Sequence, residues 1–288
     1  MGINTGIEWT DATWNPWIGC SKVSPGCDSC YMFSGMRRYG RDPGVVQRTK
    51  EATFYAPFNW KEPKRIFTCS WSDFFHKQAD PWREEAWEVI LRTPHHTYQI
   101  LTKRPGLMVA WAETHPWPDH VWAGTSVERQ KYAPRLDVLA RVPAKVRFVS
   151  AEPLLSSLDL RKWLNWTGDA GMHEPPDPVC LNWVIVGGES GPNARPMHPD
   201  WARSLRDQCH MAGVPYFHKQ NGEWVSGLGV LGGYVVLQNT WSEDHPFGNS
   251  QATPSRNIHQ WGDGYLSVKV GKKAAGALLD GREHKEMP

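Results

Sequence analysis

Three cysteines near the start of the chain have the spacing of a metal-binding loop. Cys27 and Cys30 form a C-x2-C pair, in which the intervening turn aims both sulfurs at one ion or cluster. Cys20 lies seven residues before Cys27, and the Ser-Pro-Gly of residues 24–26 favours a turn that brings the third sulfur to the same side. We therefore expect three thiolates to face one metal centre.

An iron–sulfur cluster is the favoured occupant of this loop, with a zinc ion or unligated thiols as the alternatives. Three thiolates leave one iron of a [4Fe-4S] cluster without a protein ligand, which is the position that an exchangeable small molecule would need. A structural zinc requires a fourth ligand. Residues of a suitable type for that ligand are Cys69, His76, Cys180, Cys209 and His210.

The rest of the chain has the alternating pattern of an α/β protein. Six segments combine a short β-branched or aromatic run with a polar or glycine-containing tip, and a seventh candidate strand, residues 6–9, leads into the cysteine loop. Helical periodicity over 81–92, 132–139 and 200–212 separates several of them. The six strand candidates are residues 65–70, 97–101, 121–124, 146–150, 183–186 and 214–218. This alternation predicts a parallel sheet, in a complete or partial TIM-like β/α barrel.

Two regions with different composition are expected. Residues 1–221 carry the strand and helix pattern and are predicted to form the barrel-like domain with the N-terminal cysteine loop. In residues 222–288 glycine, proline and asparagine become more frequent and the helical periodicity fades. We interpret this part as an irregular C-terminal extension packed on the barrel.

Polar residues follow the predicted strands at the end where barrel enzymes carry their chemistry. The carboxyl ends of parallel strands converge on one mouth, so these side chains should meet the cysteine loop there. They are Ser70, Ser72, Asp73, Lys103, Arg104, Ser126, Glu128, Glu152, Glu189 and Lys219. A carboxylate at a strand end also commonly caps the following helix, which is the alternative role for Asp73 and Glu128. The Lys103-Arg104 pair has an exposed turn as its alternative.

Composition limits the remaining possibilities. The net charge is +2, so no strong overall field attracts nucleic acid, although short basic clusters occur at residues 37–41, 61–65 and 103–104. The 17 tryptophans serve either packing or the stacking of bases. The chain has no apolar run of about 20 residues and no signal-peptide pattern, which predicts a cytoplasmic protein without membrane contact and with unpaired or metal-bound thiols. No Ser/His/Asp order or H-E-x-x-H motif indicates a hydrolase.

Several longer segments resemble those of a phage- and prophage-associated family of unknown function, along nearly the whole chain. They are Thr13–Cys20, Ser72–His76, Leu101–Pro105 and Val186–Gly191. The first-strand loop with three cysteines also resembles the radical S-adenosylmethionine superfamily. The usual superfamily loop is C-x3-C-x2-C with an aromatic residue before the last cysteine, whereas here the first gap has six residues and Tyr31 follows Cys30. The superfamily's Gly-Gly-Glu motif follows the second strand, but Gly187–Glu189 follows the sixth, so its role is not carried over.

The resemblance implies a specific chemistry. Cys20, Cys27 and Cys30 would ligate three irons, and S-adenosylmethionine would chelate the fourth through its amino and carboxylate groups. One electron from the reduced cluster would then cleave the cofactor to methionine and a 5′-deoxyadenosyl radical that abstracts hydrogen from a substrate. The expected cofactor contacts are Ser70, Ser72, Asp73, Ser126 and Glu128, and the expected substrate contacts are Lys103, Arg104, Glu152, Glu189 and Lys219.

The expected substrate is a nucleic acid or nucleotide, with base repair or base modification as the reaction. An electron donor and a phage-encoded partner protein are the further partners that this interpretation implies. The alternative is a non-enzymatic zinc- or iron–sulfur-binding module that binds nucleic acid or a phage protein. The two hypotheses differ in the metal that the cysteines hold and in whether the barrel mouth has room for S-adenosylmethionine.

Overall fold

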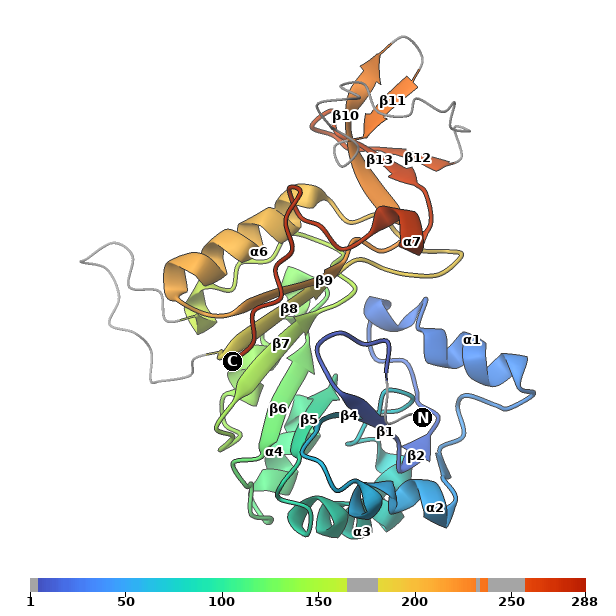
Figure 1. Ribbon diagram of the computed structural model, residues 1–288, viewed down its shortest axis with the longest axis vertical. Coiled ribbons are helices and arrows are strands. Elements are labelled where there is room, and N and C mark those ends of the chain that lie inside the picture. The colour runs from blue at the N-terminus through green and yellow to red at the C-terminus, as the bar shows by residue number, and fades with distance from the viewer. Residues whose placement is uncertain (1–4, 165–180, 232–233, 238–256) are drawn as a thin grey trace.

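The chain folds around a curled, seven-stranded parallel sheet. The computed structural model describes residues 5–164, 181–231, 234–237 and 257–288. The sheet has the order β1-β4-β5-β6-β7-β8-β9, and all its neighbouring strands are parallel. It forms a half-barrel with helices on its outer side (Figure 1). The prediction of an α/β fold with a partial TIM-like barrel is confirmed.

The elements have the following bounds. The sheet strands are β1 (Ala12–Trp14), β4 (Arg65–Thr68), β5 (Thr97–Thr102), β6 (Val121–Ser126), β7 (Arg147–Ala151), β8 (Trp183–Gly187) and β9 (Tyr216–Gln220). The helices are α1 (Tyr31–Arg38), α2 (Glu51–Phe54), α3 (Asp80–Leu91), α4 (Pro105–Ala112), α5 (Arg135–Leu139), α6 (Pro199–Ala212) and α7 (Lys272–Ala275). The short strands β2 (Trp17–Ile18) and β3 (Gln47–Arg48) pair beside the cysteine loop. None of the helices in the described part of the chain has both the length and the apolar character of a membrane-spanning segment.

The six strand candidates after the cysteine loop correspond to β4 through β9, but the first strand was predicted in the wrong place. It lies at Ala12–Trp14 and not at residues 6–9. Residues 7–10 form a turn instead, in which the Thr10 N–H donates to the Ile7 carbonyl. The turn allows Trp9 to enter the barrel, where its ring packs on Phe67 with centroids 4.6 Å apart. Burial of one large aromatic ring therefore decides the conformation of this segment.

Alternation of side chains along the strands divides the barrel interior into two layers. Successive side chains of a strand point to opposite faces, so residues two apart face the same way. The layer at the amino ends of the strands is apolar and consists of Trp9, Phe148, Trp183, Ile185 and Phe217. Two residues further along their strands, Phe148 is followed by Ser150 and Phe217 by Lys219. The apolar layer is thus a floor, and the polar layer above it faces the barrel mouth.

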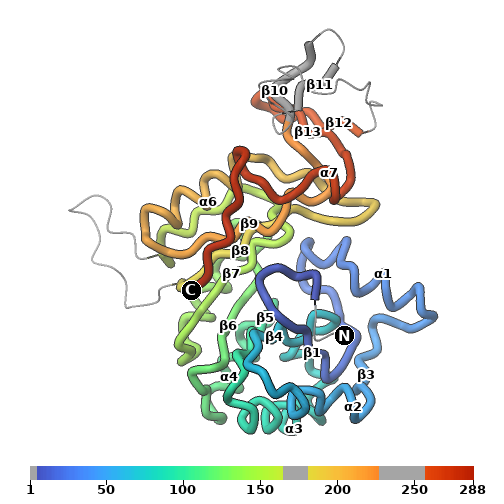
Figure 2. Tube along the Cα trace, viewed as in Figure 1, coloured from blue at the N-terminus to red at the C-terminus, as the bar shows by residue number. Residues whose placement is uncertain are grey.

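The C-terminal region contains more regular structure than the sequence predicts. Strands β10 (Trp224–Leu231), β11 (Tyr234–Leu237), β12 (Ile258–Gln260) and β13 (Leu266–Lys269) form an antiparallel sheet in the order β11-β10-β13-β12. After α7 the chain returns across α6 and ends beside β9 (Figure 2). Asp280 forms ion pairs with Arg203 and Arg206 of α6, and their guanidinium groups lower the pKa of its carboxyl.

Gly124 of β6 gives a test of the barrel floor. A Cβ atom at this position would lie 2.3 Å from Cζ of the Phe148 ring, so Gly124→Ala forces the ring or a strand to shift. Overpacking of this kind costs about 1–3 kcal/mol. We expect Gly124→Ala to lower the free energy of unfolding in urea by that amount. Gly106→Ala in α4 is the matched control, because nothing lies within 4 Å of its new Cβ, and equal losses in both variants would contradict the account.

Candidate functional site

The predicted site residues meet around one cavity at the barrel mouth. The cavity has a volume of about 530 Å³, within the range of roughly 300–1,000 Å³ that is typical of small-molecule sites. All three cysteines line it, together with residues from the tips of the strands. The predicted residues in its lining are Cys20, Cys27, Cys30, Ser70, Ser72, Asp73, Lys103, Arg104, Ser126, Glu152, Glu189 and Lys219. Glu128 is the one predicted site residue outside this lining.

Backbone contacts to two distant segments fix the start of the cysteine loop. Gly19 has a φ of +100°, and a Cβ there would lie 2.4 Å from the Val45 carbonyl oxygen, so only glycine fits without strain. The Gly19 N–H donates to the Trp71 carbonyl at 3.0 Å, and the Cys20 N–H donates to the Pro43 carbonyl at 2.8 Å. The position of Cys20 is therefore set by neighbours from both sides of the mouth.

Local helix geometry positions the other two cysteines. Cys27 ends a short 3-10 helix at Pro25–Cys27, and its N–H donates to the Ser24 carbonyl at 2.8 Å. Cys30 is the N-cap residue of α1, with an extended backbone at φ −61° and ψ 126°. The amino end of a helix favours negative charge, so a thiolate or an anionic cluster at Cys30 gains from the dipole of α1.

A single metal ion would require the three sulfurs of the loop to lie close together. A tetrahedral zinc with Zn–S bonds of about 2.3 Å holds its sulfurs about 3.8 Å apart. The groups of three or more metal-ligand residues whose ligand atoms lie within 4.8 Å of one another do not include the three cysteines. All three cysteines belong to the described residues. The three sulfurs are therefore not gathered around a single point.

The candidates for a fourth zinc ligand are distributed unevenly. Cys69 is buried and lines the same cavity. His76, Cys209 and His210 do not line it, and Cys180 lies outside the described residues. The His76 ring instead contacts the Ser21 hydroxyl at 2.9 Å, and burial lowers its pKa.

The thiols of the loop are poor nucleophiles in the absence of a metal. Burial and the nearby Asp73 raise the pKa of the Cys20 thiol to about 11, although the neighbouring Arg104 acts in the opposite direction. Burial also raises the pKa of the Cys30 thiol. Reactive cysteines have depressed pKa values, whereas a bound metal displaces the proton whatever the free pKa. The environment therefore favours a ligand role over thiol catalysis.

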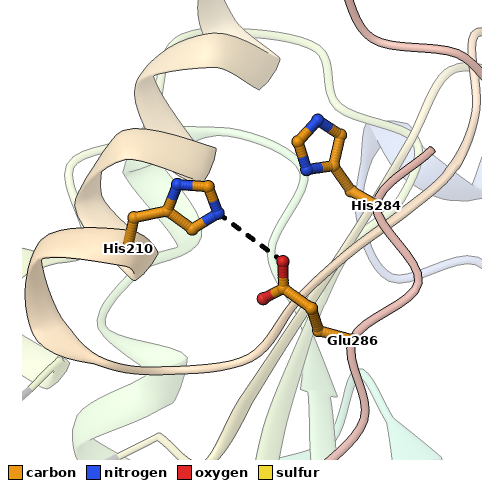
Figure 3. Close-up of side chains that lie close together, drawn as sticks. All are labelled: His210, His284 and Glu286. Carbon is orange, nitrogen blue, oxygen red and sulfur yellow. Dashed lines mark ion pairs between the residues drawn. The ribbon is translucent and has the colours of Figure 1, made fainter. Parts of the chain in front are cut away.

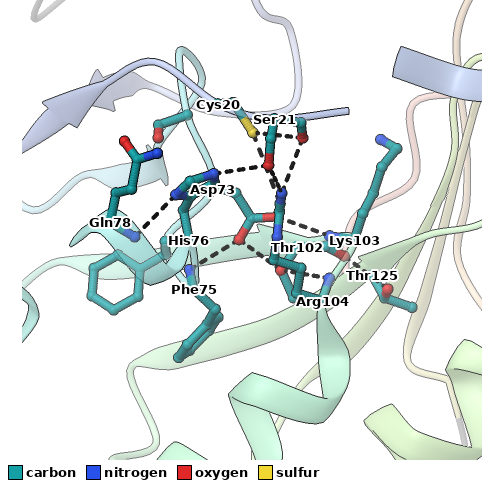
Figure 4. Close-up of polar contacts among 12 residues, drawn as sticks. Cys20, Ser21, Asp73, Phe75, His76, Gln78, Thr102, Lys103, Arg104 and Thr125 are labelled. Carbon is teal, nitrogen blue, oxygen red and sulfur yellow. Dashed lines mark hydrogen bonds and ion pairs between the residues drawn. The ribbon is translucent and has the colours of Figure 1, made fainter. Parts of the chain in front are cut away.

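Asp73 connects the cysteine loop to the strand tips (Figure 4). Its Oδ1 accepts hydrogen bonds from the Phe75 N–H at 2.9 Å and the Thr102 hydroxyl at 2.8 Å. Its Oδ2 accepts from the Lys103 N–H at 3.2 Å and from Nη1 of Arg104 at 2.8 Å. The same guanidinium donates to the Ser21 carbonyl at 3.0 Å and lies 3.8 Å from the Cys20 sulfur. Asp73 thus holds Arg104 against the cysteine loop, and its oxygens are engaged within the protein.

Glu128 has a comparable positioning role in place of the predicted cofactor contact. Its side chain is fully buried and forms a 3.0 Å ion pair with Arg135. The Gly26 N–H, next to Cys27, donates to its other oxygen at 3.4 Å. Burial alone would raise the pKa of this carboxyl, but the nearby Ser24 hydroxyl and the Arg135 guanidinium hold the pKa below its usual value. A charged Glu128 therefore holds the middle of the cysteine loop through the Gly26 N–H.

The other charged residues predicted for the site are paired, except for Lys103, and Lys272 of α7 also lines the cavity without an ion pair among the described residues. Lys219 contacts Glu152 at 2.5 Å, and Glu189 forms a bidentate pair with Arg195 at 2.6 and 2.8 Å. The ammonium group of Lys103 makes no hydrogen bond or ion pair with any residue that the structure describes. It is close enough to Cys30 for its charge to lower the pKa of that thiol. Lys103 is thus a half-buried cation available to an anionic ligand.

Sequence reasoning missed several residues of the site. Ser150 lines the cavity and lies directly opposite Ser126 in the β6–β7 pairing. Alignment of the polar ends of the two predicted strands would have identified it. Tyr31 and Trp71 line the rim with ring centroids 6.3 Å apart, and the Tyr31 hydroxyl donates to the Ser70 carbonyl at 2.5 Å. Arg195, which pairs with Glu189, follows β8 in a loop that has no local motif.

Comparison with known proteins places the chain in a family. The sequence model of one family, described as "Protein of unknown function (DUF5131)", matches residues 4–288. The chain belongs to this family. No curated protein and no solved structure is significantly similar to it. The description of DUF5131 names no activity.

The ion pair between Asp73 and Arg104 is the contact to test in this member of DUF5131. The two side chains are 7% and 15% exposed, and removal of one partner from a buried pair costs about 3–5 kcal/mol. We expect Asp73→Asn to lower the free energy of unfolding by about 2–4 kcal/mol, because the amide keeps some of the hydrogen bonds. The double variant Asp73→Asn/Arg104→Met should lose less, since it leaves no unpaired charge.

Asp159→Asn is the matched control for that experiment. Its ion pair with Arg161 is half exposed on both sides, and such surface pairs contribute about 0–1 kcal/mol. A loss for Asp73→Asn no larger than that of the control would show that Asp73 does not organise the loop. Urea unfolding followed by circular dichroism measures the three variants against the wild type.

Proposed function

We propose that this protein is an iron–sulfur enzyme of the radical S-adenosylmethionine type that acts on a nucleic acid or a nucleotide. The observation that carries the proposal is the convergence of three cysteines on one cavity at the mouth of a partial β/α barrel. The mouth is where barrel enzymes position their reacting groups. A resemblance to phage- and prophage-associated sequences is consistent with a nucleic acid as the substrate.

The residues present fit a [4Fe-4S] cluster. Three buried or half-buried thiols line one cavity, and Cys30 caps the amino end of α1. When bound, such a cluster together with S-adenosylmethionine supplies one-electron reductive cleavage and a carbon-centred radical. The three cysteines would hold the cluster, and Asp73 and Glu128 would keep the loop in place through Arg104 and Gly26.

The cavity also has features that suit the organic cofactor. Lys103 offers an unpaired ammonium to a carboxylate or phosphate. The hydroxyls of Ser126 and Ser150 lie side by side on the inner wall. The apolar floor below them, with Trp9 at its centre, separates the cavity from the other end of the barrel. Enclosure of this kind restricts water access, which protects a reactive intermediate from side reactions.

The rim of the cavity has the character of a nucleic-acid surface. Helix α1 begins at the metal loop, and its residues Tyr31, Met32 and Phe33 line the cavity. Its other end carries exposed Arg37 and Arg38, which have no ion-pair partner in the part of the chain that the structure describes. Free arginines neutralise phosphates, and exposed aromatic rings stack on bases. A nucleic-acid strand that lies along α1 would therefore enter the cavity beside the cysteine loop.

The enzyme class is tested by metal content and cofactor turnover. After anaerobic purification we expect about four iron and four sulfide per chain. Reduction with dithionite in the presence of S-adenosylmethionine should yield 5′-deoxyadenosine. The triple variant Cys20→Ala/Cys27→Ala/Cys30→Ala should lose the iron and the product, whereas Cys209→Ala, a buried thiol of α6, should retain both. One zinc per chain and no cofactor cleavage would contradict the proposal and favour a non-enzymatic binding module.

The substrate class is tested by the salt dependence of binding. Each phosphate contact contributes a slope of about −0.7 in a plot of log K against log salt for single strands. We expect Arg37→Gln/Arg38→Gln to weaken binding of a single-stranded DNA or RNA oligonucleotide and to reduce that slope by about 1.4. Lys61→Gln/Lys64→Gln, which lies before β4 at the opposite end of the barrel, is the matched control. An unchanged slope in the arginine variant would show that α1 does not contact the phosphate backbone.

A further inference from the structure

The return of the C-terminal tail brings three metal-ligand side chains together away from the cysteine loop. His210 lies in the last turn of α6, and His284 and Glu286 lie on the tail that passes beside it (Figure 3). One ligand atom from each residue lies within 4.8 Å of the other two. Two imidazoles and one carboxylate are a ligand set that zinc uses in proteins, with a fourth position left for water.

The tail holds its two ligands in a defined register. The antiparallel bridge between Lys285 and Phe217 and the hydrogen bond from the His218 N–H to the His284 carbonyl, at 2.8 Å, extend the sheet beyond β9. Residues 284 and 286 are two apart on this extended segment, so their side chains point to the same side. That side faces α6, where His210 supplies the third ligand.

The ligand atoms are not consumed by other contacts. Within the described ranges, neither imidazole makes a hydrogen bond through its ring, and a ring nitrogen of His284 faces Glu286 and His210 (Figure 3). Oε1 of Glu286 lies 3.6 Å from Nε2 of His210, which is an ion-pair distance and too long for a strong hydrogen bond. The other carboxylate oxygen accepts from the Tyr216 N–H at 2.9 Å, and this contact orients the carboxylate.

We propose that His210, His284 and Glu286 bind a divalent transition-metal ion, with Zn²⁺ as the best match, which fastens the C-terminal tail to α6 and β9. The site lies at the amino ends of the strands, because Tyr216 begins β9 and Trp183, at the start of β8, donates to the Glu286 carbonyl. Residues at this face of a barrel serve stability and not catalysis. From its place at this face we assign the ion the role of fastening the tail, and the site is separate from the cysteine loop.

Cobalt substitution provides the test, because it separates the two metal sites by their ligands. Co²⁺ bound by nitrogen and oxygen gives visible ligand-field bands without the sulfur-to-cobalt charge transfer that thiolates produce. We expect this site to take up Co²⁺ of the nitrogen and oxygen type, and Zn²⁺ to displace it. Loss of only a hydrogen bond to a metal ligand weakens binding about 10–100-fold, so loss of a ligand should weaken it at least tenfold.

Two variants remove ligands with little effect on folding. His210→Ala replaces an exposed residue by a good helix former, and Glu286→Gln keeps an acceptor for the Tyr216 N–H while it removes the charge. His95→Ala is the matched control, because His95 is exposed and is distant in sequence from the three proposed ligands. It should leave the affinity for Co²⁺ and Zn²⁺ unchanged. Equal affinity in the wild type and both ligand variants, or an equal loss in the control, would overturn the proposal.

Hydrogen exchange of the tail gives a second readout. Zn²⁺ should slow the exchange of the backbone amides of residues 283–287 at least tenfold in the wild type and in His95→Ala, and should have no effect in Glu286→Gln. Binding without this protection would show an adventitious ion on exposed histidines and would contradict the structural role. Neither the metal affinity of this site nor the hydrogen exchange of the tail depends on whether the cysteine loop holds iron.

Discussion

The hydrogen-bonded ion pair between Asp73 and Arg104 is the contact on which the geometry of the site depends. The carboxylate draws together the segment after β4, the tip of β5 and, through the guanidinium, the backbone of Ser21 next to the first cysteine. Burial of such a pair costs desolvation free energy, and removal of one partner leaves an unpaired buried charge. The pair therefore contributes mainly by specifying one arrangement of the segments that it joins. Without it, the segment after Cys20 would lose its side-chain link to the tip of β5.

The barrel makes that arrangement possible by dividing its interior. Alternation along each strand places large aromatic side chains in one layer and small or charged ones in the next. Gly124 leaves room for the Phe148 ring, and Trp9 closes the floor from the N-terminal turn. The chain thus has a packed core at one end of the strands and a polar cavity at the other. Stability and chemistry are served by different layers of the same sheet.

Much of the fold was accessible from the sequence because the signals are local. The six later strands are runs of β-branched and aromatic residues with polar tips, and the tips converge because parallel strands all end at the same edge. All the predicted site residues except Glu128 line the cavity, although they make up a minority of its lining. The same reasoning failed at residues 6–9, where a strand-like run is a turn that buries Trp9 in the barrel. The contact between Glu128 and the Gly26 N–H was also not predicted, because the two residues are 102 positions apart in the chain. The four-stranded C-terminal sheet and the tail contacts are similarly non-local.

The central claim is that the three cysteines hold an iron–sulfur cluster to which S-adenosylmethionine binds directly. Electron paramagnetic resonance of the dithionite-reduced protein, recorded with and without the cofactor, addresses this claim most directly. The account predicts the signal of a reduced [4Fe-4S] cluster whose g-values shift when S-adenosylmethionine is added, because the cofactor becomes a ligand of the fourth iron. The absence of a cluster signal from protein in which the cysteines bind zinc, or a cluster signal that the cofactor leaves unchanged, would contradict it.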